Sequence, residues 1–407
     1  MGVIMAKLAI KGGKPIRTKP FHGWPIYGEE EEKALLEVLR SGLWGIGGKK
    51  NEEFAEKFAE YQGARYGVTC ANGTVAIEIS LRALDIGFGD EVIIPAYTFM
   101  ATAQAVLYVN AFPKFVDIDP ETYTIDPKEI EKAITTKTKA IIPVHVGGAP
   151  ANMDEIMEIA EKHGLYVIED AAQAHGARWG DKGVGTIGDF GTFSFQSSKN
   201  ITAGEGGMIL TNDEELAEKA WSYMNCGRVR KGKWYEHRIL GANYRMTEFQ
   251  AALLLAQLKR ADKLFKIREE NARYLDKRLS EIEGINPLKY PPKARSAYHI
   301  YIFRYDKDKF RNLSREKFIE ALRAEGIPVS PGYIPLYKMP AFLNYKLPCN
   351  GDSFSKYCSS LHLPITERAC YGEAIWIKQQ VLLGSREDMD DIVNAIIKIR
   401  ENLSELV

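Results

Sequence analysis

Short apolar runs alternate with helical stretches between about residues 65 and 213. Several of these runs are apolar on both faces, which is typical of strands in a mainly parallel sheet that helices cover on each side. The pattern therefore predicts an α/β fold, and ligands in such folds bind beyond the carboxyl ends of the strands. The runs are EVIIPAY (91–97), KFVDI (114–118), KAIIPVHV (139–146), LYVIED (165–170), GTFSF (191–195) and GMILTN (207–212).

A second part of the chain follows a long helical stretch. Residues 246–282 contain no Gly or Pro and predict one or two long helices. The three prolines of GINPLKYPPKARS (284–296) indicate a boundary. Beyond it we expect a strand, two helices and an irregular Pro-rich stretch. The sequence thus predicts a large α/β domain over 1–284, with an N-terminal arm and the long linking helix, and a smaller C-terminal α+β domain over 285–407.

Charge along the chain is balanced. Lys plus Arg and Asp plus Glu each number 54 among 407 residues, so the formal net charge is zero. Because no overall field attracts nucleic acid or an anionic membrane, we expect the partners to be small molecules and a second copy of the chain. The loop with Arg228, Arg230, Lys231 and Lys233 could bind phosphate or nucleic acid. A solvated loop is its default interpretation, since no basic excess surrounds it.

Cysteine usage and the amino terminus indicate the compartment. The cysteines are odd in number and include no CxxC pair, which fits neither a disulfide framework nor a zinc site, so we expect no metal. The apolar run in MGVIMAKLAIKGGKP is too short for a signal peptide, and no stretch of 18 uncharged apolar residues predicts a membrane span. We therefore expect a cytoplasmic protein. The cysteines are Cys70, Cys226, Cys349, Cys358 and Cys370.

The segment GVGTIG (183–188) matches the dinucleotide-binding pattern GxGxxG. A dinucleotide site needs a strand before these glycines and a helix after them. Here a predicted strand, GTFSF, follows instead. The segment is therefore interpreted as a glycine-rich turn rather than a nucleotide site.

Reactive side chains follow two of the predicted strands. Asp170 ends LYVIED and Gln173 lies three residues later, so a carboxylate there could point into the crevice above the sheet. Ser194 ends another strand, and Lys199 follows it by five residues. A lysine at the mouth of a strand can lose its hydration, which lowers its pKa and makes it a nucleophile. Lys199 is thus the candidate nucleophile.

Two further positions could hold a ligand. Ala71, Asn72, Gly73 and Thr74 precede a predicted helix, whose free backbone N–H groups could bind a phosphate. Phe99 comes just after a strand, where its ring could stack on a planar ligand. Each feature alone has a structural explanation, as a cap, a core ring or a surface residue. Their joint order and spacing favour a site.

In these stretches the chain resembles the DegT/DnrJ/EryC1/StrS aminotransferases, fold-type I enzymes that use pyridoxal phosphate (PLP) to aminate keto sugars and keto cyclitols. The resemblance covers most of residues 30–260, in the order of the family. The matching stretches are YGVTCANGTVAI, GDEVIIPAYTFMATA, PKFVDIDPETYTID, VIEDAAQAHGA, GDFGTFSFQSSKNITAGEGGMI and GANYRMTEFQAALLLAQL.

The resemblance implies a role for each matching residue. Lys199 would be the Schiff-base lysine, and Asp170 would pair with the pyridine nitrogen of the cofactor. The enzyme would follow ping-pong kinetics, and Asn243 would reach the phosphate of a neighbouring subunit, so the resemblance implies a homodimer. The remaining implied cofactor contacts are Gln173 near the ring hydroxyl, Phe99 stacked on the ring, and Gly73, Thr74 and Ser194 on the phosphate.

One departure bears on the substrate. Many members that aminate nucleotide sugars have a histidine in a PLH stretch, whereas this chain reads PLYKMPAF, with Tyr337 at that place. The chain looks closer to the branch that aminates keto cyclitols such as scyllo-inosose or makes aminohydroxybenzoate. The expected donor is glutamine or glutamate, and the acceptor a keto cyclitol or keto sugar. A nucleotide-sugar aminotransferase and a non-catalytic regulator remain alternatives, whereas the family's dehydratases have histidine where this chain has Lys199.

Overall fold

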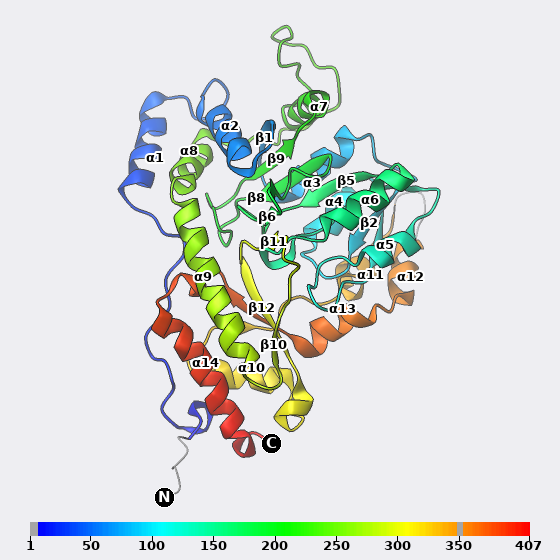
Figure 1. Ribbon diagram of the computed structural model, residues 1–407. Coiled ribbons are helices and arrows are strands. Elements are labelled where there is room, and N and C mark those ends of the chain that lie inside the picture. The colour runs from blue at the N-terminus through cyan, green and yellow to red at the C-terminus, as the bar shows by residue number, and fades with distance from the viewer. Residues whose placement is uncertain (1–6, 348–352) are drawn as a thin grey trace, which may run out of the picture.

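The structure of the protein is a computed structural model that describes residues 7–347 and 353–407. Its large sheet has the strand order β1-β9-β8-β5-β4-β2-β3. Strand β9 is antiparallel to both neighbours and the other adjacent pairs are parallel, which confirms the predicted α/β fold (Figure 1). In chain order the strands are β1 (Tyr66–Cys70), β2 (Glu91–Pro95), β3 (Phe112–Val116), β4 (Thr138–Ile141), β5 (Tyr166–Asp170), β8 (Phe190–Ser194) and β9 (Gly207–Thr211).

Helices pack on both faces of this sheet. One apolar core includes Ile77 of α3 and Val106 of α4, and the other includes Phe58 of α2 and Ile156 of α6. Both faces are therefore buried, as the apolar character of the strands predicts. The helices of this part of the chain, in order, are α1 (Glu29–Ser41), α2 (Lys50–Gln62), α3 (Gly73–Ala83), α4 (Ala101–Tyr108), α5 (Pro127–Ala133), α6 (Met153–His163) and α7 (Glu214–Met224).

The predicted helical stretch over 246–282 is two helices, α8 (Glu248–Leu258) and α9 (Ala261–Ser280). Helix α9 runs from the large sheet to a second, antiparallel sheet with the order β10-β12-β14-β13 (Figure 1). Apolar side chains of α9, α10 and α14 pack together in the core beside this sheet. The elements are β10 (Ile285–Pro287), β12 (Ile300–Tyr305), α10 (Arg315–Ala324), β13 (Val329–Ser330), α11 (Pro340–Leu343), α12 (Ser353–Ser360), α13 (Pro364–Arg368), β14 (Ala374–Lys378) and α14 (Arg386–Glu401).

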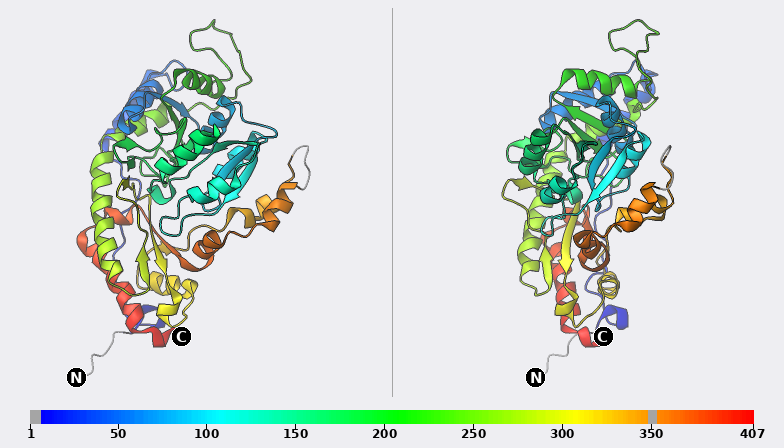
Figure 2. Two further views of the ribbon diagram at one scale, coloured as in Figure 1. Left: turned by 45° about the vertical axis from the view of Figure 1, so that its right-hand side comes forward. Right: turned by 90° about the vertical axis from the view of Figure 1, so that its right-hand side faces the viewer.

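Segments from the two ends of the chain cross between these cores. Near the amino terminus, Leu8 packs in the core of the second sheet, and Arg17 forms a 2.6 Å salt bridge with Asp388 of α14 (Figure 2). In the other direction, Phe342 of α11 and Phe354 of α12 pack into the core beside the large sheet. Packing thus joins the two sheets through more than the helix α9.

Some predicted boundaries were wrong. The strand expected over 139–146 ends at Ile141, because Pro143 and the short helical turn Val146–Gly148 follow it. Strand β1 was not predicted at all.

No helix within the described ranges is long and apolar enough to cross a membrane. Residues 1–6, which carry part of the apolar run near the amino terminus, and Cys349 lie outside the described residues. A third, small sheet joins β6 (Arg178–Trp179), β7 (Lys182–Gly183) and β11 (Ala294–Arg295).

Candidate active site

Lys199 lies in the loop between β8 and β9, where its backbone N–H donates to the carbonyl of Gln196 at 2.9 Å. Burial of its amino group lowers its pKa to about 8, although the carboxylates of Asp170 and Glu205 raise it. None of the described residues forms a hydrogen bond or a salt bridge with its Nζ atom. The side chain is half-buried. A neutral, unpaired amine is the form of lysine that attacks a carbonyl carbon.

Asp170 ends β5 and is buried. Thr102 of α4 donates to its Oδ2 atom at 2.8 Å, and the backbone N–H of Ala172 donates to its Oδ1 atom at 3.2 Å. Burial raises the pKa of this carboxyl group, whereas the hydrogen bonds and the nearby charge of Lys199 lower it. A buried carboxylate of this kind is stabilised by a cation, and a protonated ring nitrogen would supply one.

The amino end of α3 is a small cradle with unused donors. The Asn72 side chain caps the helix by accepting from the N–H of Val75 at 3.1 Å. Within the described residues, the N–H groups of Gly73 and Thr74 have no hydrogen-bond acceptor. A Cβ atom on Gly73 would lie 2.8 Å from Cβ of Ser194, so only glycine fits beside the end of β8. Free amides at a helix terminus bind phosphate, and this cradle fits one.

Gln173 is buried, and both the oxygen and the nitrogen of its side-chain amide form hydrogen bonds. Its Oε1 atom accepts from the N–H of Gly147 at 2.7 Å, and its Nε2 atom donates to the hydroxyl of Tyr333 at 2.8 Å. Burial raises the pKa of Tyr333, as does the nearby charge of Asp170. Tyr333 follows β13, so the C-terminal part of the chain reaches the same site. The sequence carried no signal for this tyrosine.

Phe99 and Asn243 are open to solvent. Phe99 is 57% exposed in the segment between β2 and α4, three residues before Thr102. Asn243 is exposed and pairs with Asn225 in an isolated bridge. No hydrogen bond or ring contact among the described residues connects either side chain to Lys199 or Asp170. The structure thus brings Lys199 and Asp170 to the same edge of the sheet, whereas Phe99 and Asn243 lie at the surface.

Two histidines behind Lys199 were not identified from the sequence. His299 is buried, and its Nδ1 atom lies 3.1 Å from Oδ1 of Asn200, the residue after the lysine. Burial lowers the pKa of His299 well below its usual value, and it lowers that of His175 to about 3. Both rings are therefore neutral at physiological pH, so neither adds a positive charge beside the amine of Lys199. His175 lies within the matching stretch VIEDAAQAHGA, and Asn200 follows Lys199 directly; these were the available signals.

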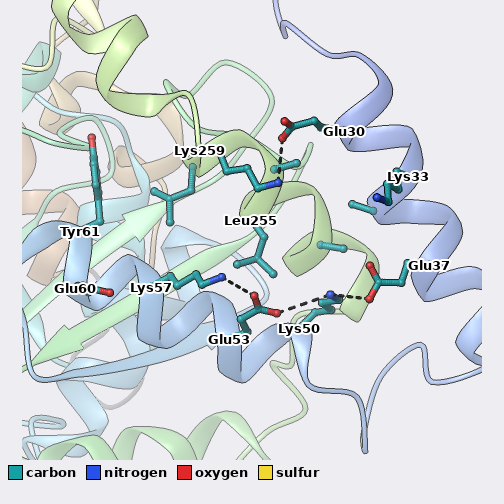
Figure 3. Close-up of a pocket in the computed structure, with 14 residues that line it drawn as sticks. Glu30, Lys33, Glu37, Lys50, Glu53, Lys57, Glu60, Tyr61, Leu255 and Lys259 are labelled. Carbon is teal, nitrogen blue, oxygen red and sulfur yellow. Dashed lines mark hydrogen bonds and ion pairs between the residues drawn. The ribbon is translucent and has the colours of Figure 1, made fainter.

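A surface hollow between α1, α2 and α8 contains none of these residues (Figure 3). Its floor is apolar and its rim is charged. The rim charges neutralise one another, as in the 2.6 Å contact of Lys57 with Glu53 and the 3.2 Å contact of Lys259 with Glu30. Neither Lys199, Asp170 nor the amino end of α3 is among the residues that line this space. The chemistry therefore belongs to the strand ends and not to this hollow.

The fold brings a lysine of lowered pKa, a buried carboxyl group and the free amides of a helix terminus to the carboxyl edge of the sheet. The model of the DegT/DnrJ/EryC1/StrS aminotransferase family matches residues 25–396. An L-glutamine:2-deoxy-scyllo-inosose aminotransferase of Streptoalloteichus tenebrarius is 38% identical over 98% of this chain and 99% of that protein. A provisionally named L-glutamine:3-amino-2,3-dideoxy-scyllo-inosose aminotransferase of the same organism is 41% identical, over 98% of this chain and 99% of that protein.

A solved structure agrees with the match to this family. The crystal structure of 3-amino-5-hydroxybenzoic acid synthase has a TM-score of 0.85 and 34% identity, and covers 93% of this chain and 98% of that one. The chain therefore belongs to the DegT/DnrJ/EryC1/StrS aminotransferase family. It is a PLP-dependent aminotransferase, as the family resemblance implied.

Proposed function

We propose that the enzyme moves the amino group of glutamine or glutamate to a keto cyclitol or keto sugar, with PLP held on Lys199. The observation that carries the proposal is the placement of Lys199 and the buried carboxylate of Asp170 at the same edge of the sheet, near enough for the charge of each to shift the pKa of the other. The names of the two relatives, which specify glutamine and inosose derivatives, support this donor and this acceptor class.

The residues at the strand ends fit the cofactor. Lys199 would hold it covalently through Nζ, and Asp170 would face its ring nitrogen. The amide cradle of α3 would bind its phosphate, which explains the unused N–H groups and the need for glycine at position 73. The full set of proposed contacts is Gly73, Thr74, Phe99, Asp170, Gln173, Ser194 and Lys199, with Asn243 from a second copy.

Catalysis depends on two proton-handling groups. PLP, when bound, supplies a conjugated ring that accepts the electrons of a breaking Cα–H bond. The anionic carboxylate of Asp170 would hold the proton on the ring nitrogen and so keep the ring able to accept those electrons. Once the amine of the donor has displaced it from the cofactor, Nζ of Lys199 would be free to take the proton from Cα of the donor, and in the second half-reaction it would deliver a proton to the corresponding carbon of the acceptor. Donor and acceptor use the same site in turn, so we expect ping-pong kinetics.

The structure bears on the choice between cyclitol and nucleotide-sugar acceptors through Tyr337. This side chain is fully buried. Its hydroxyl donates to Glu367 at 2.6 Å and accepts from the N–H of Leu363 at 3.1 Å. Tyr337 therefore offers no free group to a substrate, in line with a departure from the nucleotide-sugar branch. A nucleotide-sugar acceptor remains the alternative.

We further propose a homodimer with shared sites. Support comes from exposed apolar side chains in or against residues 240–249, the segment that carries Asn243. The backbone carbonyl of Trp44 accepts from the N–H of Glu248, and the Trp44 ring lies 5.9 Å from that of Phe249. Trp44 is 53% exposed and Leu240 is 98% exposed. The loop that carries Leu240 projects from the molecule beyond α7 (Figure 1). Surfaces of this kind are commonly buried by a second subunit.

Two further proposals concern the chain as a whole. We place the domain boundary near residue 284, where α9 has ended and β10 begins. We also propose a cytoplasmic location, which the unpaired state of the four described cysteines supports.

The first test is the absorption spectrum of the purified enzyme with PLP, before and after glutamine. We expect a visible band that moves to the near ultraviolet with glutamine and returns with 2-deoxy-scyllo-inosose. Lys199→Ala should abolish both changes while thermal unfolding stays near that of the wild type. A Lys199→Ala variant that turns over at the wild-type rate would contradict the assignment of the lysine. Return of the band only with a nucleotide-linked keto sugar would favour the alternative acceptor.

The shared site has its own test. Asn243→Ala should weaken PLP binding, and sedimentation should find the wild type as a dimer. At a PLP concentration too low to load Asn243→Ala, mixing Lys199→Ala with Asn243→Ala subunits should restore part of the activity, because a mixed dimer contains one site with both residues intact. No recovery from a mixture that demonstrably exchanges subunits would count against shared sites.

A further inference from the structure

The glycine-rich turn GVGTIG begins at the last residue of β7 and leads to β8, and the strand that follows it confirms that it is not a dinucleotide motif. Its three glycines have packing reasons. A Cβ atom on Gly183 would lie 1.9 Å from a backbone oxygen, one on Gly188 would lie 2.6 Å from another, and one on Gly185 would lie 2.6 Å from the ring of Phe193. Gly185 also has φ of +81°, which favours glycine. The turn is therefore built to bring its amides close to the interior.

Those amides surround the chain's own carboxylate, that of Glu169. This residue is completely buried beside Asp170 in β5. The N–H groups of Ile187 and Gly188 donate to its Oε1 atom at 2.7 and 2.9 Å. The N–H of Gly185 donates to its Oε2 atom at 2.7 Å. A buried carboxylate is stable here because several backbone donors satisfy it.

The fourth partner of Glu169 is His145, which is also completely buried. Its Nε2 atom lies 3.0 Å from Oε2 of Glu169, and its Nδ1 atom accepts from the N–H of Ala151 at 3.0 Å. Since Nδ1 is an acceptor, the ring proton must be on Nε2, where it donates to the carboxylate. The hydrogen bonds thus run in one direction, from Ala151 through the ring to Glu169.

The same segment touches two polar residues of the proposed cofactor site, Asp170 and Gln173. The backbone N–H of His145 donates to the carbonyl of Asp170 at 3.1 Å, and the N–H of Asp170 donates to the carbonyl of Pro143 at 2.9 Å. Two residues further on, the N–H of Gly147 donates to Oε1 of Gln173 at 2.7 Å. These contacts lie beyond the end of β4, where only an isolated parallel bridge between Val144 and Asp170 continues the strand pairing.

We propose that Glu169 and His145 are positioning residues, which hold residues 143–151 against the end of β5 and thereby fix Asp170 and Gln173 for the cofactor. The proposal rests on the proposed function, because it concerns the placement of residues around PLP. Neither side chain touches the reacting atoms.

Glu169→Gln is a sharp test because it changes one oxygen to an amino group. If that group faces Ile187 and Gly188, it meets two N–H donors. If it faces Gly185 and His145, the ring can accept only by moving its proton to Nδ1, where the N–H of Ala151 points. In either orientation the new NH2 group faces another N–H donor, and a buried donor without an acceptor is destabilising.

Glu325→Gln is the matched control. Glu325 is 1% exposed and accepts from the N–H groups of Ala9 and Ile16 at 2.8 and 2.9 Å and from Nζ of Lys398 at 2.9 Å. It lies at the end of α10, near the two chain termini and away from the carboxyl edge of the large sheet (Figure 1). The chemical change and the burial are the same, whereas the contact with the proposed site is absent.

The readouts are the dissociation constant of PLP from the apoprotein, the visible circular dichroism per bound PLP, and kcat and KM for glutamine at saturating PLP. For Glu169→Gln we expect PLP affinity and kcat each to fall about tenfold or more, with KM changed less than about threefold. The circular dichroism per bound PLP should fall as the ring loses its fixed orientation. Glu325→Gln should lower the melting temperature alone. If Glu169→Gln does not fold, His145→Asn, which loses the donor to Glu169, replaces it.

The outcomes separate the two proposals. If wild-type protein binds no PLP, the proposed function fails, and this inference fails with it. If wild type binds PLP and both Glu→Gln variants differ only in melting temperature, or lower PLP affinity equally, then Glu169 has a general structural role and the inference alone is overturned.

Discussion

Lys199 should react with an aldehyde over a pH range set by a pKa of about 8 rather than by the 10.5 of an ordinary lysine. The attacking species is the neutral amine, so a lowered pKa raises the reactive fraction at neutral pH. At pH 7 that fraction is about one in 3,000 for a pKa of 10.5 and about one in 11 for a pKa of 8. The gain is about 300-fold.

The rate at which apoprotein forms its visible band with excess PLP measures this reaction. The same reaction of free Nα-acetyl-lysine is the control, because it shares the ionisations of PLP itself. The ratio of the two rates should be high and flat below about pH 8, and should then fall about tenfold per pH unit towards 10.5. The amine of Lys199 is less basic than that of free lysine and can therefore be intrinsically less nucleophilic. This would multiply the ratio by a constant factor and leave its dependence on pH unchanged.

Asp170→Asn extends the same test. The carboxylate of Asp170 raises the pKa of Lys199 against the larger effect of burial. Removal of that negative charge should therefore move the break in the ratio to lower pH. A ratio that stays flat from pH 6 to 10 in the wild type would show that Lys199 is solvated and has an ordinary pKa, and would refute the reasoning.

Three substitutions test the surrounding contacts. Thr102→Val removes the donor to Asp170 and should raise the pKa of that carboxyl group, so PLP affinity should fall about 10- to 100-fold, most strongly at low pH; a titration with unchanged affinity would argue against this hydrogen bond. Gly73→Ala places a Cβ atom 2.8 Å from that of Ser194 and should weaken the binding of PLP, and of inorganic phosphate as a competitor, at least about tenfold. Tyr337→Phe should lower the free energy of unfolding by about 1–3 kcal/mol with kcat unchanged, and a changed kcat with unchanged stability would mean that this hydroxyl faces the substrate.

Local patterns in the sequence determined much of this protein. Apolar runs flanked by turns predicted the strands that form the large sheet, apart from β1 and some boundaries. Because the carboxyl ends of parallel strands share one edge, Asp170 and Lys199 could be placed together from their positions after two strands. Asn72 and Gly73 indicated a helix start nearby by their residue types, although α3 begins at Gly73 and so includes two residues that were predicted to precede it. These features depend on neighbours in the chain, which is why a single sequence reveals them.

The tertiary structure decided which distant groups meet. Thr102 and Asp170 are 68 positions apart, and Gln173 and Tyr333 are 160 apart, so no local pattern signals either hydrogen bond. The turn GVGTIG matched a nucleotide motif by its letters, and only the fold revealed that its amides serve Glu169. Glycine spacing specifies where a backbone can bend, but the group that its amides bind depends on which strand the folded chain brings alongside.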